Sequence, residues 1–238
     1  MIQNPDMPCP VDVAGSEYAG DCFLVAGNGL FLQKRTDLFT TLVKVNGVGF
    51  LPDLKAETKF TAPRIPAGLT ARIKLFFHLV CNRYQAEACV LLLFDPVAQK
   101  YAVKVPAQRV SGASVIYDRR HHSDVWLQVG TIHSHNDFGA FHSHTDSDDE
   151  RYFDGLHCTF GHNDQEAISV TSSMVVNGVR TTLPPENVFA GLVSNGERFH
   201  LDSNLTPEQV QEVASWLRLV NEWHELPKVT GDTVIFTL

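Results

Sequence analysis

Histidine, serine and aspartate side chains are concentrated between residues 130 and 150. This stretch reads GTIHSHNDFGAFHSHTDSDDE and contains four histidines and a run of carboxylates. His133 and His135 follow residues 125–129, whose β-branched and aromatic side chains favour a strand. Because side chains alternate along a strand, both imidazoles point to the same face and can hold one ion between them. Asp146 adds a carboxylate, which predicts a zinc site with three protein ligands and a fourth position for water.

Two further side chains have the types that hydrolysis at such a site needs. Zinc lowers the pKa of a bound water toward neutrality, and a carboxylate outside the ligand set must take the proton and pass it to the departing amine. Glu87, the acidic residue of the apolar segment 87–94, is the candidate; a surface charge on an edge strand is the alternative interpretation. Ser143 is a candidate to donate a hydrogen bond to the oxyanion, an interaction that is worth about 3 kcal/mol. The alternative interpretation is that Ser143 caps the next helix.

The neighbouring polar residues have plainer interpretations. His142 and His144 are predicted to be loop residues, with contact to metal or substrate as the alternative. Ser134 faces away from the adjacent histidines on a regular strand, so we assign it to packing. Residues 148–150, Asp-Asp-Glu, are predicted to form the solvated first turn of a helix, where acidic groups favour the helix dipole; contact with a basic patch on a partner is the alternative.

The spacing of these residues resembles a known family signature. His133-Ser134-His135, seven residues, Ser143, two residues and Asp146 match the JAMM (MPN-plus) zinc metalloprotease signature at each specified position. That signature also requires a glutamate on an earlier strand after the first helix, where Glu87 stands. The resemblance implies one Zn²⁺ per chain and cleavage of a peptide or isopeptide bond after the C-terminus of a ubiquitin-like protein. It also implies a JAB/MPN (cytidine-deaminase-like) core.

The resemblance covers residues 69–161, less than half of the chain. Family members commonly have glycines in the first strand, as in G-L-L-x-G, whereas this chain has Val90 and Phe94, which leaves the shape of the substrate groove open. Residues 138–141 and 154–158 are similar to a bacterial subgroup and, more loosely, to protein A of the PRTRC systems of plasmids and mobile elements. Such systems also carry a ubiquitin-like protein and a ThiF-type (E1-like) protein, which the resemblance implies as partners.

Two other metal-binding folds fit the histidines less well. The H-x-H-x-D-H pattern of metallo-β-lactamases fits His133, His135 and Asp137, but Phe138 stands where the next histidine is needed. A cupin would need a glutamate three or four residues after His135, where Phe138 and Gly139 stand. A non-catalytic MPN-type binding scaffold would typically have lost the metal ligands. The zinc content of the purified protein distinguishes the scaffold from the enzyme: about one zinc per chain supports the enzyme, and none favours the scaffold.

Composition excludes several classes of function. The 238 residues have a net charge of −8 and no Lys/Arg cluster, which disfavours nucleic acid as a direct partner. No apolar run reaches the roughly 18 residues of a membrane span, and the N-terminus lacks the features of a signal peptide. Five scattered cysteines without a C-x-x-C pair favour reduced thiols in a cytoplasmic protein. His157 and Cys158 are strand neighbours whose side chains should diverge, so a Cys–His nucleophile pair is not expected.

The remaining pattern predicts an α+β (α/β-like) fold, a mixed β-sheet flanked by helices. Two prolines between residues 61 and 68 suggest a boundary between a β-rich N-terminal region of unknown role, 1–66, and a metalloprotease-like domain, 67–238. A hairpin is expected to turn at residues 27–29 and a helix to span 69–84. Further strands are expected at 38–45, 87–94, 101–105, 114–117, 125–135, 156–161, 168–176 and 179–183. Thr206-Pro207-Glu208-Gln209 predicts the start of a last helix that runs through Val220.

Overall fold

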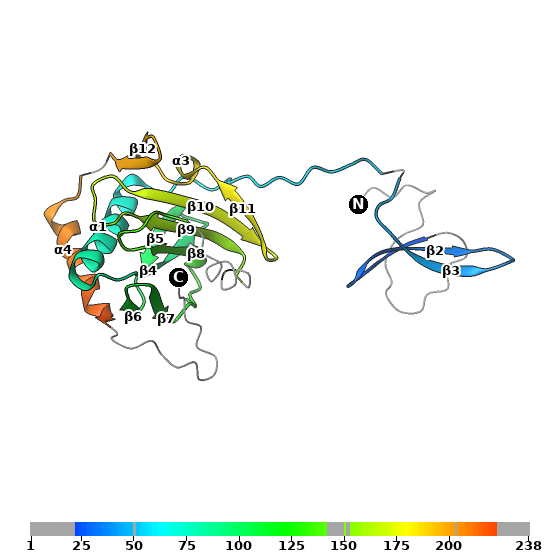
Figure 1. Ribbon diagram of the computed structural model, residues 1–238, viewed down its shortest axis with the longest axis horizontal. Coiled ribbons are helices and arrows are strands. Elements are labelled where there is room, and N and C mark those ends of the chain that lie inside the picture. The colour runs from blue at the N-terminus through cyan, green and yellow to red at the C-terminus, as the bar shows by residue number, and fades with distance from the viewer. Residues whose placement is uncertain (1–21, 50, 142–149, 151–152, 203, 223–238) are drawn as a thin grey trace. The chain divides into compact units, whose positions relative to one another are not determined.

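The computed structural model describes residues 22–49, 51–141, 150, 153–202 and 204–222. The chain divides into two compact units between Glu57 and Thr58 (Figure 1). The sequence had suggested a boundary at residue 66 instead. The difference arises because the intervening residues pack on the second unit: Ile65 is fully buried, and its N–H donates to the carbonyl of Val188 at 2.8 Å.

The first unit contains a three-stranded antiparallel sheet in the order β1-β2-β3. Its strands are β1 (Cys22–Ala26), β2 (Gly29–Arg35) and β3 (Thr40–Val45). Ala26 pairs with Gly29 across the turn, so the predicted hairpin is confirmed. Gly29 has a φ of +138°, which explains why a residue without a Cβ ends this turn.

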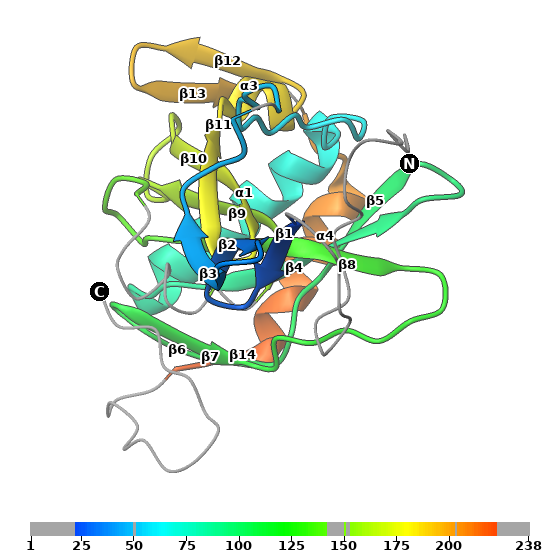
Figure 2. The same ribbon diagram turned by 90° about the vertical axis from the view of Figure 1, so that its right-hand side faces the viewer.

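The second unit is built on a six-stranded mixed sheet. Its order is β11-β10-β9-β8-β4-β5, and only the β8–β9 pair is parallel (Figure 2). The strands are β4 (Cys89–Asp95), β5 (Lys100–Lys104), β8 (Leu127–Ser134), β9 (Gly155–Gly161), β10 (Ser169–Val176) and β11 (Val179–Leu183). Each overlaps a strand expected from the sequence, and the α+β class with a mixed sheet is confirmed.

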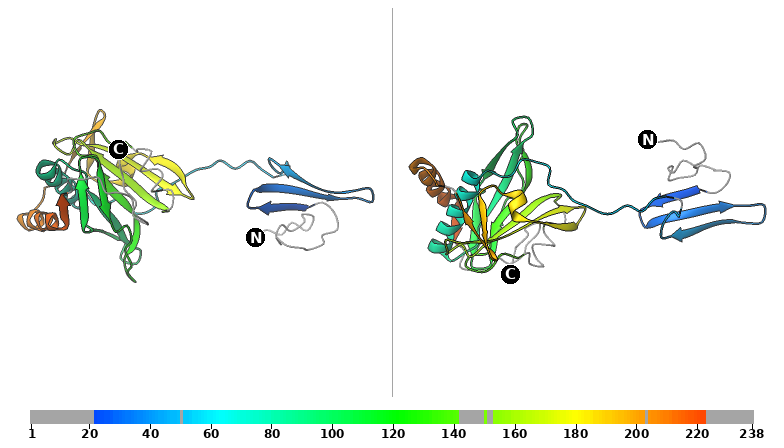
Figure 3. Two further views of the ribbon diagram at one scale, coloured as in Figure 1. Left: turned by 60° about the horizontal axis from the view of Figure 1, so that its bottom comes forward. Right: turned by 90° about the horizontal axis from the view of Figure 1, so that it is seen from above.

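Helix α1 (Ala67–Tyr84) covers one face of this sheet, and α4 (Pro207–Trp216) packs on the outer side of α1 (Figure 3). The Phe77 ring meets Phe160 of β9 edge-on, with centroids 5.8 Å apart. The Phe76 ring meets Trp216 at the same distance. The predicted periodicity of the first helix is confirmed, because Ile73, Phe76, Phe77 and Val80 are all fully buried.

The capping box of α4 is confirmed, but the predicted end of this helix is wrong. Thr206 accepts from the N–H of Gln209, and the Gln209 side chain accepts from the N–H of Thr206. The helix ends at Trp216 and is followed by the 3₁₀ turn η1 (Leu217–Leu219) and strand β14 (Val220–Glu222). Val220 leaves the helix because it pairs in parallel with Gln108, where it is buried.

The short elements were not all expected. Strands β6 (Gln108–Ser111), β7 (Ser114–Tyr117) and β14 form a sheet in the order β14-β6-β7, and only β7 was predicted. Helix α3 (Pro185–Val188) and the hairpin of β12 (Leu192–Asn195) and β13 (Arg198–Leu201) were also missed. None of the described helices is long and apolar enough to cross a membrane.

The two faces of the six-stranded sheet differ in polarity. The face against α1 carries apolar side chains: Val90, Leu92, Ile132, Cys158 and Phe160. Alternation and strand register place buried polar side chains on the opposite face: Thr131, His133, His157, Thr159 and Ser173. The expected divergence of His157 and Cys158 is therefore confirmed. The buried side chains that can bind an ion or move a proton on these strands therefore lie on the opposite face.

Candidate metal centre

Two imidazoles converge at the end of β8. His133 lies in the strand and His135 directly follows its last residue, where its N–H donates to the carbonyl of Phe160 at 2.9 Å and so continues the parallel pairing with β9. The Nε2 atoms of the two histidines are 3.2 Å apart. Their side chains are 7% and 0% exposed, respectively. Strand alternation thus brings two nitrogen donors together in a buried position.

The separation of these nitrogens fits a shared ion. Zinc–nitrogen bonds of about 2.0–2.1 Å at a tetrahedral angle put two ligand nitrogens roughly 3.3 Å apart. Two neutral imidazoles at 3.2 Å can also share a hydrogen bond, in which one Nε2–H donates to the other Nε2. In either arrangement the two Nε2 atoms face each other at close range, and this spacing fits two nitrogen ligands of one metal ion.

The other predicted ligand lies outside the described residues. This ligand is Asp146. Also outside the described residues are Ser143, His142, His144, Asp148 and Asp149. Among the described residues, no group of three or more His, Cys, Asp and Glu side chains is arranged to hold a metal ion. Asp137 is exposed in the turn after His135, which gives no support to an H-x-H-x-D-H site.

Glu87 is buried beside the ends of β4 and β8. It lies in the connection between α1 and β4 rather than in the strand, because its N–H donates to Ser111 of β6 at 3.0 Å. The expected strand therefore begins later, at Cys89. The side chain is only 3% exposed, so the alternative interpretation as an edge-strand surface charge is wrong.

Ser134 fixes the register between these two chain segments. Its N–H donates to the carbonyl of Ala88, and its Oγ accepts from the N–H of Ala88, both at 2.8 Å. The pairing of Cys89 with His133 thus extends beyond β4 to Ala88 and Ser134, the residues adjacent in sequence to Glu87 and His135. Ser134 is fully buried, as its assignment to packing implies, but its contact with Ala88 was not foreseen from the sequence.

Asn163 holds the turn that follows His135. Its N–H and its Nδ2 both donate to the carbonyl of Asn136 at 2.9 Å, and Nδ2 also donates to Phe160 at 2.7 Å. Asn136 has a φ of +46°, a conformation that asparagine tolerates better than most residues. The sequence contained no sign of this role, because Asn163 is 27 residues from Asn136.

The next residues lie directly against the end of β9. The N–H of His162 donates to the carbonyl of Phe138, and the N–H of Ala140 donates to Ser169 Oγ at 2.7 Å. A Cβ on Gly161 would lie 2.3–2.4 Å from backbone atoms of residues 138–140, so only glycine permits this approach. Phe141 then places its ring edge-on against His135, with centroids 4.5 Å apart. The described part of the loop, up to Phe141, is therefore fixed beside the histidine pair.

The structure corrects one expectation about the acidic residues. Glu150 was predicted to be solvated, yet it is 5% exposed and forms an ion pair with Arg180 of β11. The sequence pattern could not reveal this, because the partner stands 30 residues later in the chain. Thr159 of β9 is a second residue that the sequence missed: its Oγ1 lies 3.2 Å from His133 Nε2.

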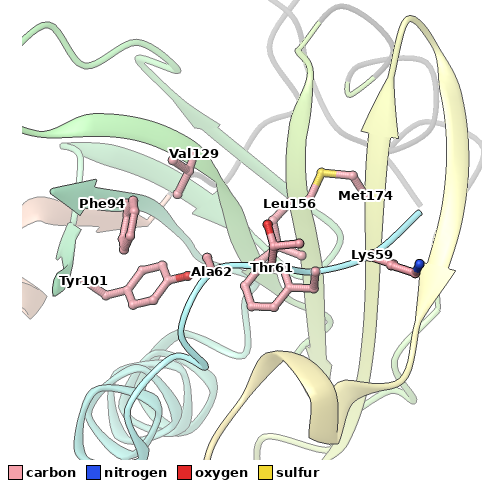
Figure 4. A pocket seen from close by; sticks show the side chains of 9 residues that line it. Lys59, Thr61, Ala62, Phe94, Tyr101, Val129, Leu156 and Met174 are labelled. Carbon is pink, nitrogen blue, oxygen red and sulfur yellow. The ribbon is translucent and has the colours of Figure 1, made fainter. Parts of the chain in front are cut away.

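A separate apolar pocket lies at the other end of the sheet. It has a volume of about 200 Å³ and is covered by the segment that carries Lys59 and Thr61 (Figure 4). Val129 and Leu156, which line it, stand near the start of the parallel strands, whereas the histidines stand at the end of β8. Burial raises the pKa of Tyr101 in its wall to about 12. Tyr101 is therefore protonated at neutral pH and does not serve as a base there.

Comparison with protein-family models gives no match, and comparison with curated proteins gives none either. Two buried imidazole nitrogens 3.2 Å apart can bind a divalent cation, and the buried Glu87 follows directly from the paired residues Ala88 and Ser134.

Proposed function

We propose that this protein is a zinc-dependent hydrolase of the JAMM type, which cleaves a peptide or isopeptide bond after the C-terminus of a ubiquitin-like protein. The observation that carries the proposal is the 3.2 Å approach of the His133 and His135 Nε2 atoms on the buried polar face. The mixed sheet with α1 on its other face supports a JAB/MPN-type core. A ubiquitin-like protein or its conjugate is the proposed substrate, and a ThiF-type protein a further partner.

His133, His135 and Asp146 are the proposed ligands of one Zn²⁺. Two neutral nitrogens and one carboxylate leave such an ion with net positive charge and an open position. When bound, zinc would supply a water of near-neutral pKa and would polarise the scissile carbonyl. The burial of both imidazoles supports this assignment, because a dry site strengthens the attraction between ion and ligands.

Glu87 is the proposed general acid and base. Its carboxylate would accept a proton as the water attacks the carbonyl carbon, and would donate that proton to the amine nitrogen as the C–N bond breaks. Its burial, next to Ala88 where that residue pairs with Ser134, supports this role. Ser143 is proposed to donate a hydrogen bond to the oxyanion formed in between.

Zinc content tests the ligand set. The purified protein is expected to contain about one zinc per chain, and His133→Ala or Asp146→Ala to remove it. His122→Ala is the matched control, because His122 is exposed in a connection before β8 and should leave zinc bound. Full zinc occupancy in both ligand variants would rule out this site, and a wild-type protein without zinc would favour the non-catalytic scaffold.

Activity requires a separate experiment. The protein is incubated with a ubiquitin-like protein whose C-terminus is joined to a reporter by a peptide bond, and in parallel with an isopeptide-linked conjugate. Cleavage that stops with a chelator and returns with added zinc supports the proposal. A zinc-loaded protein that cleaves neither substrate contradicts the proposed reaction but not the metal site.

A further inference from the structure

A buried ion pair joins β11 to the chain at residue 150. Arg180 donates through Nη2 to the Glu150 carboxylate and through Nη1 to Ser173 Oγ on β10. Glu150 and Ser173 are both buried, and the Arg180 side chain is only partly exposed. A buried carboxylate is costly unless its charge is compensated, so Glu150 keeps this position only while the guanidinium is present.

His157 occupies the space between this pair and β8. Its Nε2 lies 2.9 Å from the carbonyl of Phe153, which can only accept, so Nε2 carries the hydrogen. Burial lowers the pKa of His157, against the opposing effect of Glu150, and the ring is neutral near pH 7. Its Nδ1 then accepts from Thr131 Oγ1 at 2.9 Å. His157 Nδ1 also lies 3.5 Å from Glu150 Oε1, but because this ring is neutral, the charge of Glu150 is compensated by Arg180.

This cluster shares its two strands with the candidate metal centre. Thr131 is two residues before His133 on β8, and Thr159, whose Oγ1 lies 3.2 Å from His133 Nε2, is two residues after His157 on β9. All four side chains point to the polar face of the sheet. Glu150 is also four residues after Asp146 in the sequence. The ion pair thus fixes the chain on the same face as the two histidines.

We propose that Arg180 and Glu150 are positioning residues of the metal centre, whose ion pair holds the chain at residue 150 against the face that carries His133, so that zinc affinity depends on it. The inference rests on the proposed zinc-binding function. Neither side chain is proposed to touch the ion or the substrate. The pair would act through His157, whose Nδ1 lies 3.5 Å from Glu150 Oε1 and 2.9 Å from Thr131 Oγ1 on the strand that carries His133.

A positioning role and a purely electrostatic role predict opposite changes in zinc affinity when Arg180 loses its charge. Loss of a positive charge near a cation site should raise zinc affinity, and loss of a negative charge should lower it. If the pair positions the chain, both losses lower the affinity, because each leaves the partner buried and alone. Replacing both groups by apolar side chains removes that penalty, so the double variant should recover part of the affinity.

The experiment measures zinc affinity of the full-length protein by competition with a chromophoric chelator near pH 7. Arg180→Met and Glu150→Leu are each expected to weaken binding by about ten- to a hundredfold, the usual effect of removing a group that orients a metal ligand. The double variant is expected to bind more tightly than the weaker single variant. Arg180→Lys keeps the positive charge but loses the planar guanidinium with its two directed hydrogen bonds. Its zinc affinity should lie between those of the wild type and Arg180→Met.

Arg72→Met is the matched control. It breaks the ion pair between Arg72 Nη1 of α1 and Glu212 of α4, at 3.0 Å and away from the polar face of the sheet. Its zinc affinity should equal that of the wild type, even where its free energy of unfolding falls. Circular dichroism confirms which variants are folded, and if Arg180→Met is not, Glu150→Leu and Arg180→Lys carry the test.

Two results overturn the inference. One is wild-type zinc affinity in the folded single variants; the other is tighter binding by Arg180→Met with weaker binding by Glu150→Leu, the electrostatic signature. A wild-type protein that binds no zinc overturns the proposed function and this inference together. Zinc binding that is unchanged by loss of the ion pair overturns this inference alone.

Discussion

Glu87 is an acidic residue in a buried position, only 3% exposed. Glu87→Gln preserves the size of the side chain but removes its ability to accept a proton. Because Glu87 is outside the proposed ligand set, zinc content should stay at the wild-type level, while the rate of hydrolysis should fall by about 10²–10⁴. Metal analysis and a cleavage assay on the same preparation check both halves. Loss of zinc in Glu87→Gln would instead identify Glu87 as a ligand.

Individual site residues differed in how far the sequence revealed them. The histidine pair could be found because an alternating pattern on a strand is a local property, and the structure places both Nε2 atoms within 3.2 Å. Asn163, Arg180 and Thr159 could not be found, because each acts on a residue 26 or more positions away. Glu150 was misjudged for the same reason: its local pattern is that of a solvated helix start.

At the scale of elements, the contact between β9 and the loop after His135 depends on Gly161. In Gly161→Ala, the new Cβ would lie 2.3 Å from the Ala140 nitrogen and 2.4 Å from the Phe138 oxygen, so the loop must move. The free energy of unfolding should fall by about 1–3 kcal/mol, the usual cost of overpacking. Zinc affinity should fall as well, because this loop continues directly from His135.

Gly68→Ala in α1 is the control for that prediction, since a Cβ there would meet nothing within 4 Å. It should leave zinc affinity unchanged and stabilise the protein slightly, by up to about 1 kcal/mol. Urea denaturation monitored by circular dichroism gives the free energies of unfolding. Equal stabilities of Gly161→Ala and Gly68→Ala would show that the loop does not need this close approach.

The packing of α1 on the sheet makes a prediction about two thiols. Burial, with smaller contributions from Asp164 and Asp137, raises the pKa of Cys81 to about 11, and burial raises the pKa of Cys158 well above its usual value. Since the thiolate is the reactive form, neither should be alkylated by iodoacetamide near pH 7.5 in the time that fully labels the urea-denatured chain. Peptide mass mapping measures this, and complete labelling of Cys158 in the native protein would contradict it.

Elements with a long periodic pattern or a specific end signal were predictable. Helix α1 has several turns over which one apolar face repeats, and the start of α4 has the reciprocal contacts of Thr206 and Gln209. Strands β6 (QRVS) and β14 (VNE) are short and mostly polar, whereas β7 (SVIY), as short as β6, has the β-branched Val115 and Ile116. The pairing of Gln108 with Val220 spans most of the second unit, so only the tertiary fold determines it.

At the scale of the whole molecule, the two units differ in how well they bury apolar side chains. The second unit has one hydrophobic cluster, and its described buried members run from Ile65 to Val220. The described residues of the first unit leave large apolar side chains exposed, including Val25, Phe39, Leu42 and Val43. A small three-stranded sheet with so little buried surface is marginal by itself. Stability and the proposed chemistry are therefore both assigned to residues 58–238.

Deletion of residues 1–57 tests this division. Because the hydrophobic cluster and the described candidate site residues lie beyond Glu57, the shortened protein should keep its urea midpoint, its zinc content and its cleavage rate on a small fusion substrate. The isolated fragment 1–57 should show no cooperative thermal transition, since its sheet buries too few side chains to offset the loss of chain entropy. Circular dichroism of both pieces measures these outcomes. A lower midpoint or loss of zinc in the shortened protein would mean that the N-terminal unit contributes to the fold or to the site.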